Sequence, residues 1–369
     1  MKIRPGIVLI LFSLIVCMED TAARGLPLDN IKLPPGFEIN LFADNVPNAR
    51  SMAVGEKGTI FVGTHSAGKV YALRDENNDG KADNKYLIAS GLNMPNGIAY
   101  RNGSLYVAEV HRLLKFDAIE KNIASPPRPK IIRDDLPVET HHGLRTIGFD
   151  SDEWLYIAIG APCNICLEPD YAQIRRMRPD GSDEQVYAEG IRNSVGFTWH
   201  PVTNKLWFTE NGRDQLGDDQ PADEVNSAEK KGQHYGFPYC HGEIFPDPEY
   251  GKGKSCKSYV PPAQPLPAHV APLGIVFYTG NQFPKKYQNQ MLIAEHGSWN
   301  RSKKAGYKIS LIELEGNRPV SYTDFATGWK QGEKAWGRPA YLLNMPDGSL
   351  LISDDHNGVI YRITYTHEN

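Results

Sequence analysis

The stretch "NGIAYRNGSLYVAEVHRLLKF", residues 96–116, contains short apolar runs on either side of an Asn-Gly pair. Short runs that alternate or are continuously apolar predict β-strands, and Asn-Gly is a preferred pair for a tight hairpin turn. The same plan of strand, turn and strand recurs in stretches that begin at residues 51, 145, 194, 273 and 339. The chain is therefore expected to be a series of similar hairpins.

Six hairpins of one kind predict an all-β chain folded as a six-bladed β-propeller. No long helical period interrupts them, and a β-sandwich would not explain the repetition. The chain has 369 residues and 40% hydrophobic content, which is enough for one large core. We expect a single propeller domain over residues 24–369, with an insertion at 210–270.

The N-terminal residues have the pattern of a secretory signal peptide. Two cations precede an apolar run at residues 7–16, and small residues follow at 21–23. The apolar run is too short to span a bilayer, so we expect a leader over residues 1–23 that is removed near Ala23. A lipoprotein anchored at Cys17 is the alternative, although the bulky Val16 disfavours it. Either reading predicts a periplasmic or secreted protein.

Four cysteines remain once Cys17 is removed with the leader. An even number in an exported chain favours disulfides. Cys240 and Cys256 flank one loop and are expected to form a bridge across it. Cys163 and Cys166 have the spacing of a zinc or redox half-site, but no second pair matches them, so a local disulfide is preferred.

The net charge of −4 gives the chain no general attraction to nucleic acid or to an anionic membrane. We expect a monomer that acts on a small molecule. In a propeller, the loops of one face meet over the central channel, so polar residues ahead of the inner strands can form one pocket. The residues in such positions are basic or polar: His141, His142, Arg145, Arg192, Asn193, Arg301 and Arg338. They predict a site for an anion with several carboxylates.

Four motifs, in this order, are "HHGLRTIGF", "APCNIC", "AEHGSWNRS" and "SDDHNGVIYRI". The chain resembles the soluble quinoprotein glucose/sorbosone dehydrogenase family, most closely its L-sorbosone dehydrogenase-like branch, over nearly the whole mature chain. Members of this family are six-bladed propellers that hold pyrroloquinoline quinone (PQQ) and calcium. The resemblance implies an oxidoreductase that oxidises an aldose or a related sugar or aldehyde.

The resemblance also implies roles for individual residues. His141 or His142 would be the base that takes the substrate proton, and both remain candidates. Arg192 would face the quinone oxygens and Asn193 would support the ring. Oxidation by this route needs a base, a hydride acceptor and stabilisation of the charge that arises on the acceptor.

The remaining cations and carbonyls complete the implied site. Arg145, Arg301 and Arg338 would bind the cofactor, and the backbone carbonyls of Gly212 and Arg213 would bind its calcium. Lys308 is expected to be a strand residue with a solvent-facing amine. Asp354 and Asp355 are expected either to orient the arginines or to form a turn.

The segment "DENNDGKAD" carries a separate metal signal. Asp75, Asn77, Asp79 and Asp83 have calcium-loop spacing, and Gly80 stands at the sharp turn. The acidic residue usual at the twelfth position is replaced by Tyr86. The segment is therefore either a second calcium site or an ordinary Asn/Asp/Gly turn.

Two other functions remain open on the same fold, because propellers serve many purposes. One is a non-enzymatic propeller that binds a sugar or a protein. The other is a calcium-dependent, lactonase-type hydrolase, which the convergent arginines disfavour. The sequence has no haem-attachment CxxCH motif, so a dehydrogenase would need an external electron acceptor.

Overall fold

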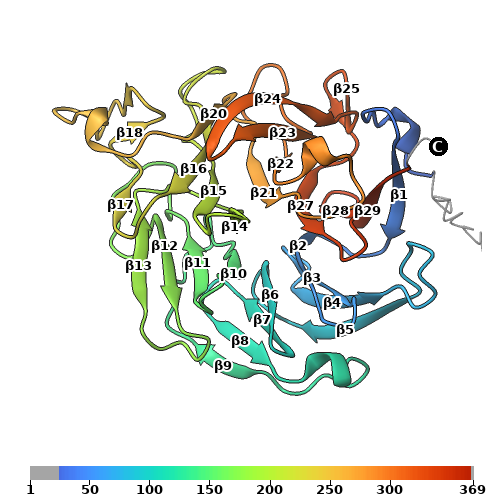
Figure 1. Ribbon diagram of the computed structural model, residues 1–369. Helices are drawn as coiled ribbons and strands as arrows, with labels where there is room; N and C mark the ends of the chain where they lie inside the picture. The colour runs from blue at the N-terminus through green and yellow to red at the C-terminus, as the bar shows by residue number, and fades with distance from the viewer. Residues whose placement is uncertain (1–24, 367–369) are drawn as a thin grey trace, which may run out of the picture.

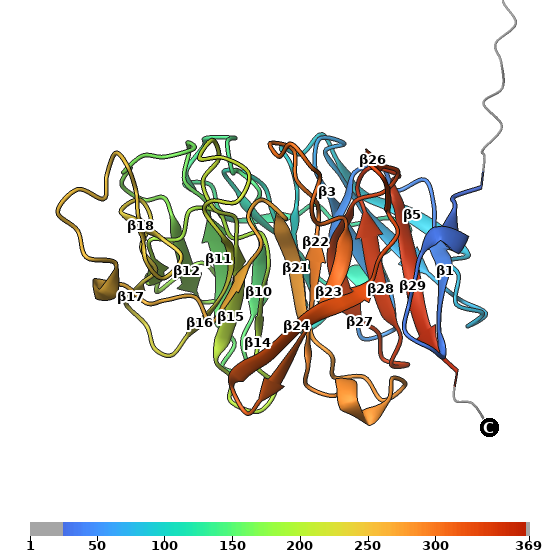
Figure 2. The same cartoon turned by 90° about the horizontal axis from the view of Figure 1, so that it is seen from above.

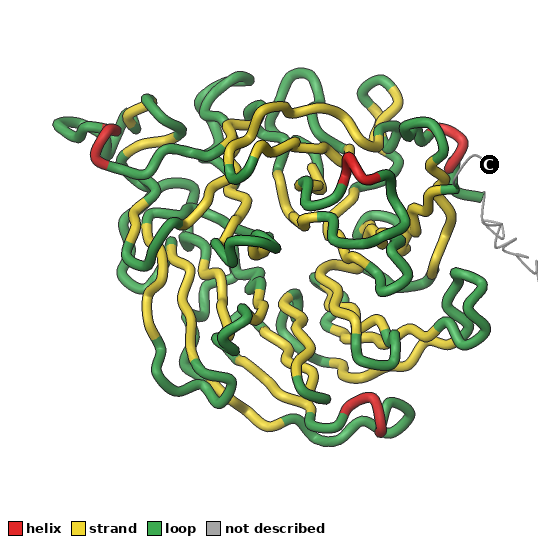
Figure 3. Tube along the Cα trace, viewed as in Figure 1, coloured by secondary structure: helices red, strands yellow, loops and turns green. Residues whose placement is uncertain are grey.

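The computed structural model describes residues 25–366, and within this range six β-sheets are arranged as blades around a common axis (Figure 1). Strands and loops make up nearly all of the chain, and the helices are short 3-10 turns (Figure 3). The prediction of an all-β, six-bladed propeller is confirmed. The predicted leader over residues 1–23, together with Cys17, lies outside the described residues.

The first three blades follow one another along the chain. Blade 1 consists of β2 (Ala49–Val54), β3 (Ile60–Thr64), β4 (Lys69–Arg74) and β5 (Asn84–Ser90). Blade 2 consists of β6 (Gly97–Arg101), β7 (Ser104–Ala108), β8 (Leu113–Phe116) and β9 (Lys130–Arg133). Blade 3 consists of β10 (Ile147–Phe149), β11 (Leu155–Ile159), β12 (Gln173–Met177), β13 (Gln185–Glu189) and the parallel strand β17 (Gln233–His234).

The last three blades complete the ring. Blade 4 consists of β14 (Phe197–Trp199), β15 (Leu206–Glu210), β16 (Asp223–Ala228) and β20 (Gln264–Leu266). Blade 5 consists of β21 (Pro272–Phe277), β22 (Met291–Glu295), β23 (Lys308–Glu315) and β24 (Arg318–Ala326). Blade 6 consists of β27 (Pro339–Asn344), β28 (Leu350–Asp354), β29 (Val359–Tyr365) and β1 (Phe37–Ala43).

Two short hairpins and several 3-10 helices lie outside the six blade sheets. The hairpins are formed by β18 (Cys240–His241) with β19 (Phe245–Pro246) and by β25 (Lys330–Gln331) with β26 (Lys334–Ala335). The 3-10 helices are η1 (Leu28–Asn30), η2 (Ile119–Lys121), η3 (Cys256–Ser258) and η4 (Lys285–Tyr287). No helix among residues 25–366 has the length and apolar character needed to cross a membrane.

The predicted hairpin at residues 96–116 forms the first strands of blade 2. Arg101 of β6 pairs with Ser104 of β7, so the turn between them is the Asn-Gly pair itself. Asn102 and Gly103 have φ values of 48° and 75°, which a type I′ turn requires at both central positions. The local sequence therefore determines the register of this hairpin.

Apolar side chains fill the space between neighbouring blades. Between blades 1 and 2, Phe61 and Val70 belong to one fully buried cluster with Leu105 and Val107. Phe61 also stacks on Tyr100, with the ring centroids 5.8 Å apart. Each such side chain contributes about 1.5–3 kcal/mol when it leaves water. Each hairpin is thus stabilised by the next one around the ring.

Blade 6 closes the ring by joining the two ends of the chain. Its outer strand β1 runs antiparallel to β29, in a register that pairs Phe37 with Tyr365 (Figure 1). The Phe37 ring contacts Phe283, Tyr287 and Phe325 edge-on, at centroid distances of 4.7, 5.3 and 5.2 Å. The hairpin at residue 339 was predicted from the sequence, whereas the pairing with residues 37–43 was not.

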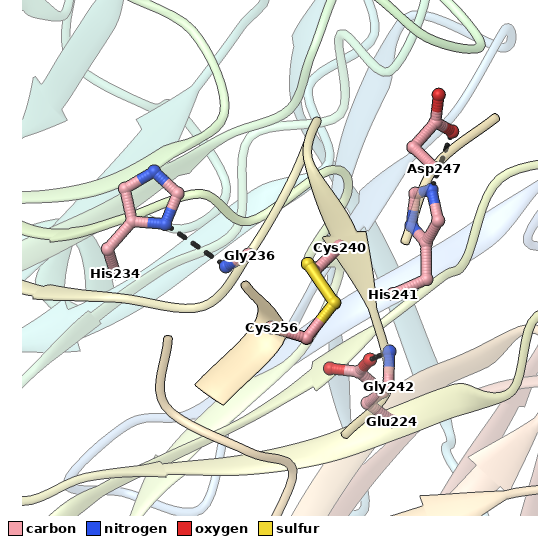
Figure 4. The surroundings of a disulfide bond; sticks show 8 residues. All are labelled: Glu224, His234, Gly236, Cys240, His241, Gly242, Asp247 and Cys256. Carbon is pink, nitrogen blue, oxygen red and sulfur yellow. Dashed lines mark hydrogen bonds and ion pairs between the residues drawn. A yellow bond between two sulfur atoms is a disulfide. The ribbon is translucent and has the colours of Figure 1, made fainter. Parts of the chain in front are cut away.

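The insertion that projects from the ring around β18 is shorter than the expected 210–270, because β16 and β20 lie within that range and belong to blade 4 (Figure 2). A disulfide joins Cys240 to Cys256 in this insertion, and the backbone amide of Gly242 donates to Glu224 of β16 at 2.6 Å (Figure 4). A second disulfide joins Cys163 to Cys166. Both predicted bridges are therefore present in the structure.

We predict that replacing both Cys240 and Cys256 by Ser lowers the free energy of unfolding by about 3 kcal/mol, because the bridge closes a loop of this length. The separation of the two cysteines is 16 residues. Urea denaturation of the purified variant and wild type measures the difference. Equal stabilities, or free thiols at both positions in the wild type, would contradict the prediction.

Candidate active site

A cavity of about 230 Å³ lies where loops from five blades converge. Its wall includes polar side chains from each of these blades: Arg50, His142, Arg192, Asn193, His296 and Arg338. The structure therefore brings together five residues that the sequence singled out, which are His142, Arg192, Asn193, Gly212 and Arg338. Arg50 and His296 are additions that sequence reasoning missed.

Arg192 is almost fully buried in the cavity wall, and the protein satisfies all of its donors. Its Nε donates to the Asn164 carbonyl at 2.8 Å, and its Nη1 donates to the carbonyls of Asn211 and Gly212 at 3.0 and 2.8 Å. Its Nη2 donates to the Asn164 Oδ1 and to Asp214, each at 3.0 Å. Burial lowers the pKa of the guanidinium, and Asp214 opposes this effect. Arg192 is thus a fixed cation in a defined orientation.

Asn193 carries a buried oxygen with no partner in the part of the chain that the structure describes. This oxygen is its side-chain Oδ1, and the residue lines the cavity. A Cβ on Gly160 would lie 3.0 Å from this oxygen and 2.7 Å from the Cβ of His142. Glycine at position 160 therefore leaves room for both residues in their present positions. An unpaired buried acceptor is costly, which makes Asn193 suited to a ligand that donates a hydrogen bond.

The two candidate histidines differ in their surroundings. His142 lines the cavity, whereas His141 is exposed and its ring lies 4.2 Å from that of His142. The Nδ1 of His142 lies 2.8 Å from the carbonyl oxygen of Ala161. A carbonyl only accepts, so Nδ1 carries the hydrogen and Nε2 of the neutral ring is left as an acceptor.

Burial lowers the pKa of His142 well below its ordinary value, and the charge of Arg192 adds to this effect. The pKa of His141 is also lowered, first by burial and then by Arg192. His142 therefore remains neutral at neutral pH, as a proton acceptor must. Its backbone has a φ of 51°, a left-handed conformation that is uncommon for a residue with a side chain.

A second group of charges lies on the wall formed by blades 1, 5 and 6. The Nε of Arg50 lies 2.9 Å from Asp355, and the Nε2 of His296 donates to the same carboxylate at 2.8 Å. Burial tends to raise the pKa of Asp355, but Arg50 and His296 hold it well below its usual range. Asp355 thus orients an arginine, as one of its two predicted roles required, although the partner is Arg50.

Arg338 extends this cationic wall. Its Nε and Nη2 donate to the carbonyls of His296 and Gly297 at 3.2 and 2.9 Å. Within residues 25–366 it forms no ion pair with a carboxylate. Its charge is therefore uncompensated by direct contact. Asp354 instead forms the turn that was its other predicted role, because it accepts the amides of His356 and Asn357 at 2.9 and 3.0 Å.

Arg145 and Arg301 do not line the cavity. Arg145 is fully buried and donates to the carbonyls of Val110 and Pro137 at 3.0 and 2.7 Å, so it supports the loop before β10 from behind. Arg301 pairs with Asp219 at 3.0 Å on the surface.

Lys308, at the start of β23, pairs with Asp324 at 2.6 Å. Arg145, Arg301 and Lys308 thus lie outside the cavity and have partners within the protein, whereas Arg338 lines the cavity.

The two candidate metal loops differ in what their oxygens contact. Gly212 lines the cavity, and its carbonyl accepts one hydrogen bond from Arg192 at 2.8 Å, which leaves a second lone pair. The neighbouring Arg213 points away and pairs with the buried Asp247 at 2.5 Å. Asp223, which also lines the cavity, accepts the amides of Gly212 and Ala271 at 2.8 and 2.9 Å, which fixes both loops.

In the loop at residues 75–83 the side-chain oxygens accept from the loop's own amides. Asp75 accepts from Gly80 at 2.8 Å, Asn77 from Asp79 at 2.8 Å and Asp83 from Glu76 at 2.7 Å. Residues 25–366 contain no group of three or more His, Cys, Asp or Glu side chains that could hold a metal ion. The loop has the hydrogen bonds of an ordinary turn, and the second calcium stays a prediction.

Arg50, His296 and Asp214 line the cavity but were not predicted from the sequence, and the sequence indicates them to different extents. Arg50 stands at the start of the first hairpin, in a position like that of Arg338 before the last one, so the same rule could have found it. His296 lies within a quoted motif but at the end of β22 rather than ahead of an inner strand. Asp214 follows β15 in the acidic stretch, where nothing local separates it from its neighbours.

Comparisons with known proteins agree with this fold. A family model described as TrAA12-like matches residues 31–366. An uncharacterised protein from Borreliella burgdorferi is 34% identical over 351 residues, 91% of each chain. The aldose sugar dehydrogenase YliI of Escherichia coli is 28% identical over 179 residues, 43% of this chain and 46% of that enzyme. The holo form of the pyranose dehydrogenase PQQ domain from Coprinopsis cinerea has a TM-score of 0.78 at 18% identity, covering 90% of this chain and 97% of that one.

We predict that Asp355→Asn lowers the pKa of His296 further. Burial already lowers this pKa from 6.5 to about 4, and the carboxylate opposes that shift by favouring the imidazolium. Because the folded-state pKa lies below that of the unfolded chain, this group makes the protein less stable as the pH falls from 6.5 to about 4. Histidine NMR titration of both proteins measures the change, and a wild-type His296 that titrates near 6.5 would contradict it.

Proposed function

The chain belongs to the TrAA12-like family of PQQ-dependent sugar dehydrogenases, and we propose that it uses this cavity to oxidise an aldose or a related sugar or aldehyde. The observation that carries the proposal is the set of three arginines that line one cavity, Arg50, Arg192 and Arg338. PQQ is an anion with several carboxylates, so its binding favours converging guanidinium groups.

The described residues fit such a cofactor. Arg338 lacks a carboxylate partner among them, and Asn193 holds a buried acceptor without a donor. Arg50 and Arg338 are proposed to bind the cofactor's carboxylates, and Asn193 to contact its ring. Calcium would be held by the carbonyls of Gly212 and Arg213. When bound, the quinone supplies the hydride acceptor, and calcium supplies a Lewis acid that polarises it.

His142 is proposed to be the base. Its Nδ1 hydrogen is directed at the Ala161 carbonyl, so its Nε2 is available to take a proton from the substrate hydroxyl. Its lowered pKa keeps it neutral at neutral pH. Arg192 contributes a fixed positive charge at the wall, because its donors already contact the protein. Arg145 supports the loop of His142 and is proposed to act only through that loop.

Several features support an exported enzyme. Two disulfides within the described chain favour an oxidising compartment, which agrees with a signal peptide over residues 1–23 and a periplasmic or secreted protein. The electrons are proposed to pass to an external acceptor. We propose that the protein acts as a monomer on a small substrate.

Reconstitution tests the proposal. Purified apo-protein is mixed with PQQ and calcium, and the reduction of a redox dye is followed with a panel of aldoses and sugar aldehydes. Sugar-dependent dye reduction that requires PQQ is expected. Protein that binds sugar without PQQ would support the non-enzymatic reading, and hydrolysis of lactones with calcium alone would support the hydrolase; either result without dye reduction overturns the proposal.

We predict that His142→Gln lowers kcat by roughly a hundredfold or more while PQQ stays bound, because a positioned base is lost. His141→Gln is the matched control and should change kcat little. The wild-type kcat should rise with pH as the imidazole of the base loses its proton, with a midpoint below 6.5 because the pKa of His142 is lowered. Steady-state kinetics over pH measure both effects. Near-full kcat in His142→Gln would place the base elsewhere.

We predict that Arg192→Ala weakens PQQ binding by about 2–3 kcal/mol, because the cavity loses a fixed positive charge and the hydrogen bonds that hold the carbonyls of Asn211 and Gly212. Arg133→Ala serves as a control, since Arg133 is also ion-paired but contacts Asp135 and Glu184 away from the cavity. Titration of PQQ into each apo-protein with calcium present gives Kd. An unchanged Kd in Arg192→Ala, with the fold intact by circular dichroism, would remove Arg192 from the site.

A further inference from the structure

The Cys163–Cys166 disulfide lies in the loop that joins β11 to β12 in blade 3, directly behind the cavity wall. The two cysteines are separated by three positions, so the bridge closes a very small ring. A bridge over so few residues removes little conformational freedom from the unfolded chain, because that effect grows with loop length. Its main consequence is therefore local: it restricts the backbone of Asn164 and Ile165.

Asn164 uses both its backbone and its side chain to hold residues of blade 4. Its carbonyl accepts from Arg192 Nε at 2.8 Å, and its Oδ1 accepts from Arg192 Nη2 at 3.0 Å. The same Oδ1 accepts the amide of Asp214 at 2.8 Å, while its Nδ2 donates to the Asp214 carbonyl at 3.2 Å. One residue inside the ring thus fixes the plane of a guanidinium and the backbone of a cavity loop.

Asn164 does not line the cavity, but it contacts two residues that do, Arg192 and Asp214. Asp214 uses one carboxylate oxygen for Arg192, at 3.0 Å, and the other for Asn300, at 2.9 Å. The carbonyl of Gly212, two residues earlier, also accepts from Arg192. A shift of Asn164 would therefore move the cation and the carbonyls on one side of the cavity together.

We propose that Asn164 is a positioning residue for the cofactor site and that the Cys163–Cys166 disulfide holds it in place, so that reducing this bridge weakens PQQ binding. The inference rests on the proposed function, in which Arg192 supplies a fixed positive charge beside PQQ and the carbonyls of Gly212 and Arg213 hold calcium. The reductant is a dithiol. Two electrons and two protons pass from it to the bridge, which gives two cysteine thiols and a cyclic disulfide of the reagent.

The bridge is accessible enough for this reaction. Both cysteines are half-buried rather than buried. Leu167, immediately after the ring, is 59% exposed, so the ring borders solvent. The other bridge provides an internal comparison, because it joins Cys240, which is only 2% exposed, to the half-buried Cys256 in the segment between β16 and β20.

The first experiment measures the Kd of PQQ, with calcium present, for apo-protein variants. Asn164→Ala and the double variant Cys163→Ser with Cys166→Ser are expected to raise Kd by roughly tenfold or more, since hydrogen bonds to a charged group are lost or loosened. The double variant Cys240→Ser with Cys256→Ser should leave Kd within about twofold of wild type even though it loses stability. Circular dichroism and thermal unfolding confirm that each variant is folded.

A double-mutant cycle of Asn164 with Arg192 distinguishes a positioning role of Asn164 from general damage to the fold. If Asn164 acts through Arg192, Asn164→Ala should raise Kd much less in an Arg192→Ala background than in the wild type. Equal effects in the two backgrounds would contradict the proposal. Asn164→Ala or the Cys163/Cys166 variant with wild-type Kd would also overturn it.

The second experiment reduces the bridge in folded protein. In the Cys240→Ser, Cys256→Ser background, dithiothreitol has only the Cys163–Cys166 bridge to reduce among residues 25–366. The Kd of PQQ should rise on reduction and return to its starting value after reoxidation. The same Kd in both redox states would overturn the proposal. If the wild-type apo-protein does not bind PQQ, the proposed function fails. If it binds PQQ but the Asn164 and bridge variants leave Kd unchanged, the proposed function stands and this inference fails.

Discussion

The antiparallel pairing of β1 with β29 is the constraint on which the rest of the structure depends. It places the first described strand beside the last one, so the blades form a closed ring rather than an open array with an unpaired edge. The ring of Phe37 packs among aromatic side chains of blade 5, which couples this closure to the core. Only in a closed ring do the loops ahead of the inner strands meet at one cavity.

The cavity shows how the protein stabilises buried positive charge. Removing a guanidinium from water is unfavourable, so each buried arginine is bound by carbonyls, by a carboxylate or by both. Arg192 receives five such contacts, which come from the loops of blades 3 and 4. Arg50 shares Asp355 with His296, and Arg338 has carbonyl partners alone. Arg338 therefore keeps an uncompensated positive charge at the cavity, where an anionic cofactor would be stabilised.

Local patterns in the sequence were sufficient to predict the blades but not to predict every residue of the cavity. The Asn102–Gly103 turn sets its own register, so the hairpins and their number could be predicted. The rule that residues ahead of an inner strand reach the pocket correctly predicted that Arg192, Asn193 and Arg338 line the cavity. Arg145 occupies a similar position, yet its side chain turns toward the carbonyls of Val110 and Pro137. Side-chain direction depends on partners that are distant in sequence.

Long-range pairing explains the other omissions as well. Asn164 lies 28 residues from Arg192 and 50 from Asp214, and no local pattern indicates that these three residues meet. Strand β1 is likewise paired with a segment at the opposite end of the chain. The choice between His141 and His142 depended on which ring faces the cavity. These long-range contacts form only when the blades assemble into a ring. Local sequence patterns predict the hairpins but not which residues of other blades lie beside them.

The most direct test of the central claim is a crystal structure of the protein reconstituted with PQQ and calcium. We predict electron density for the quinone inside the cavity, with carboxylates against Arg50 and Arg338 and with Asn193 and His142 beside the ring. Quinone bound elsewhere on the molecule, or density in the cavity that contacts none of these residues, would contradict the account.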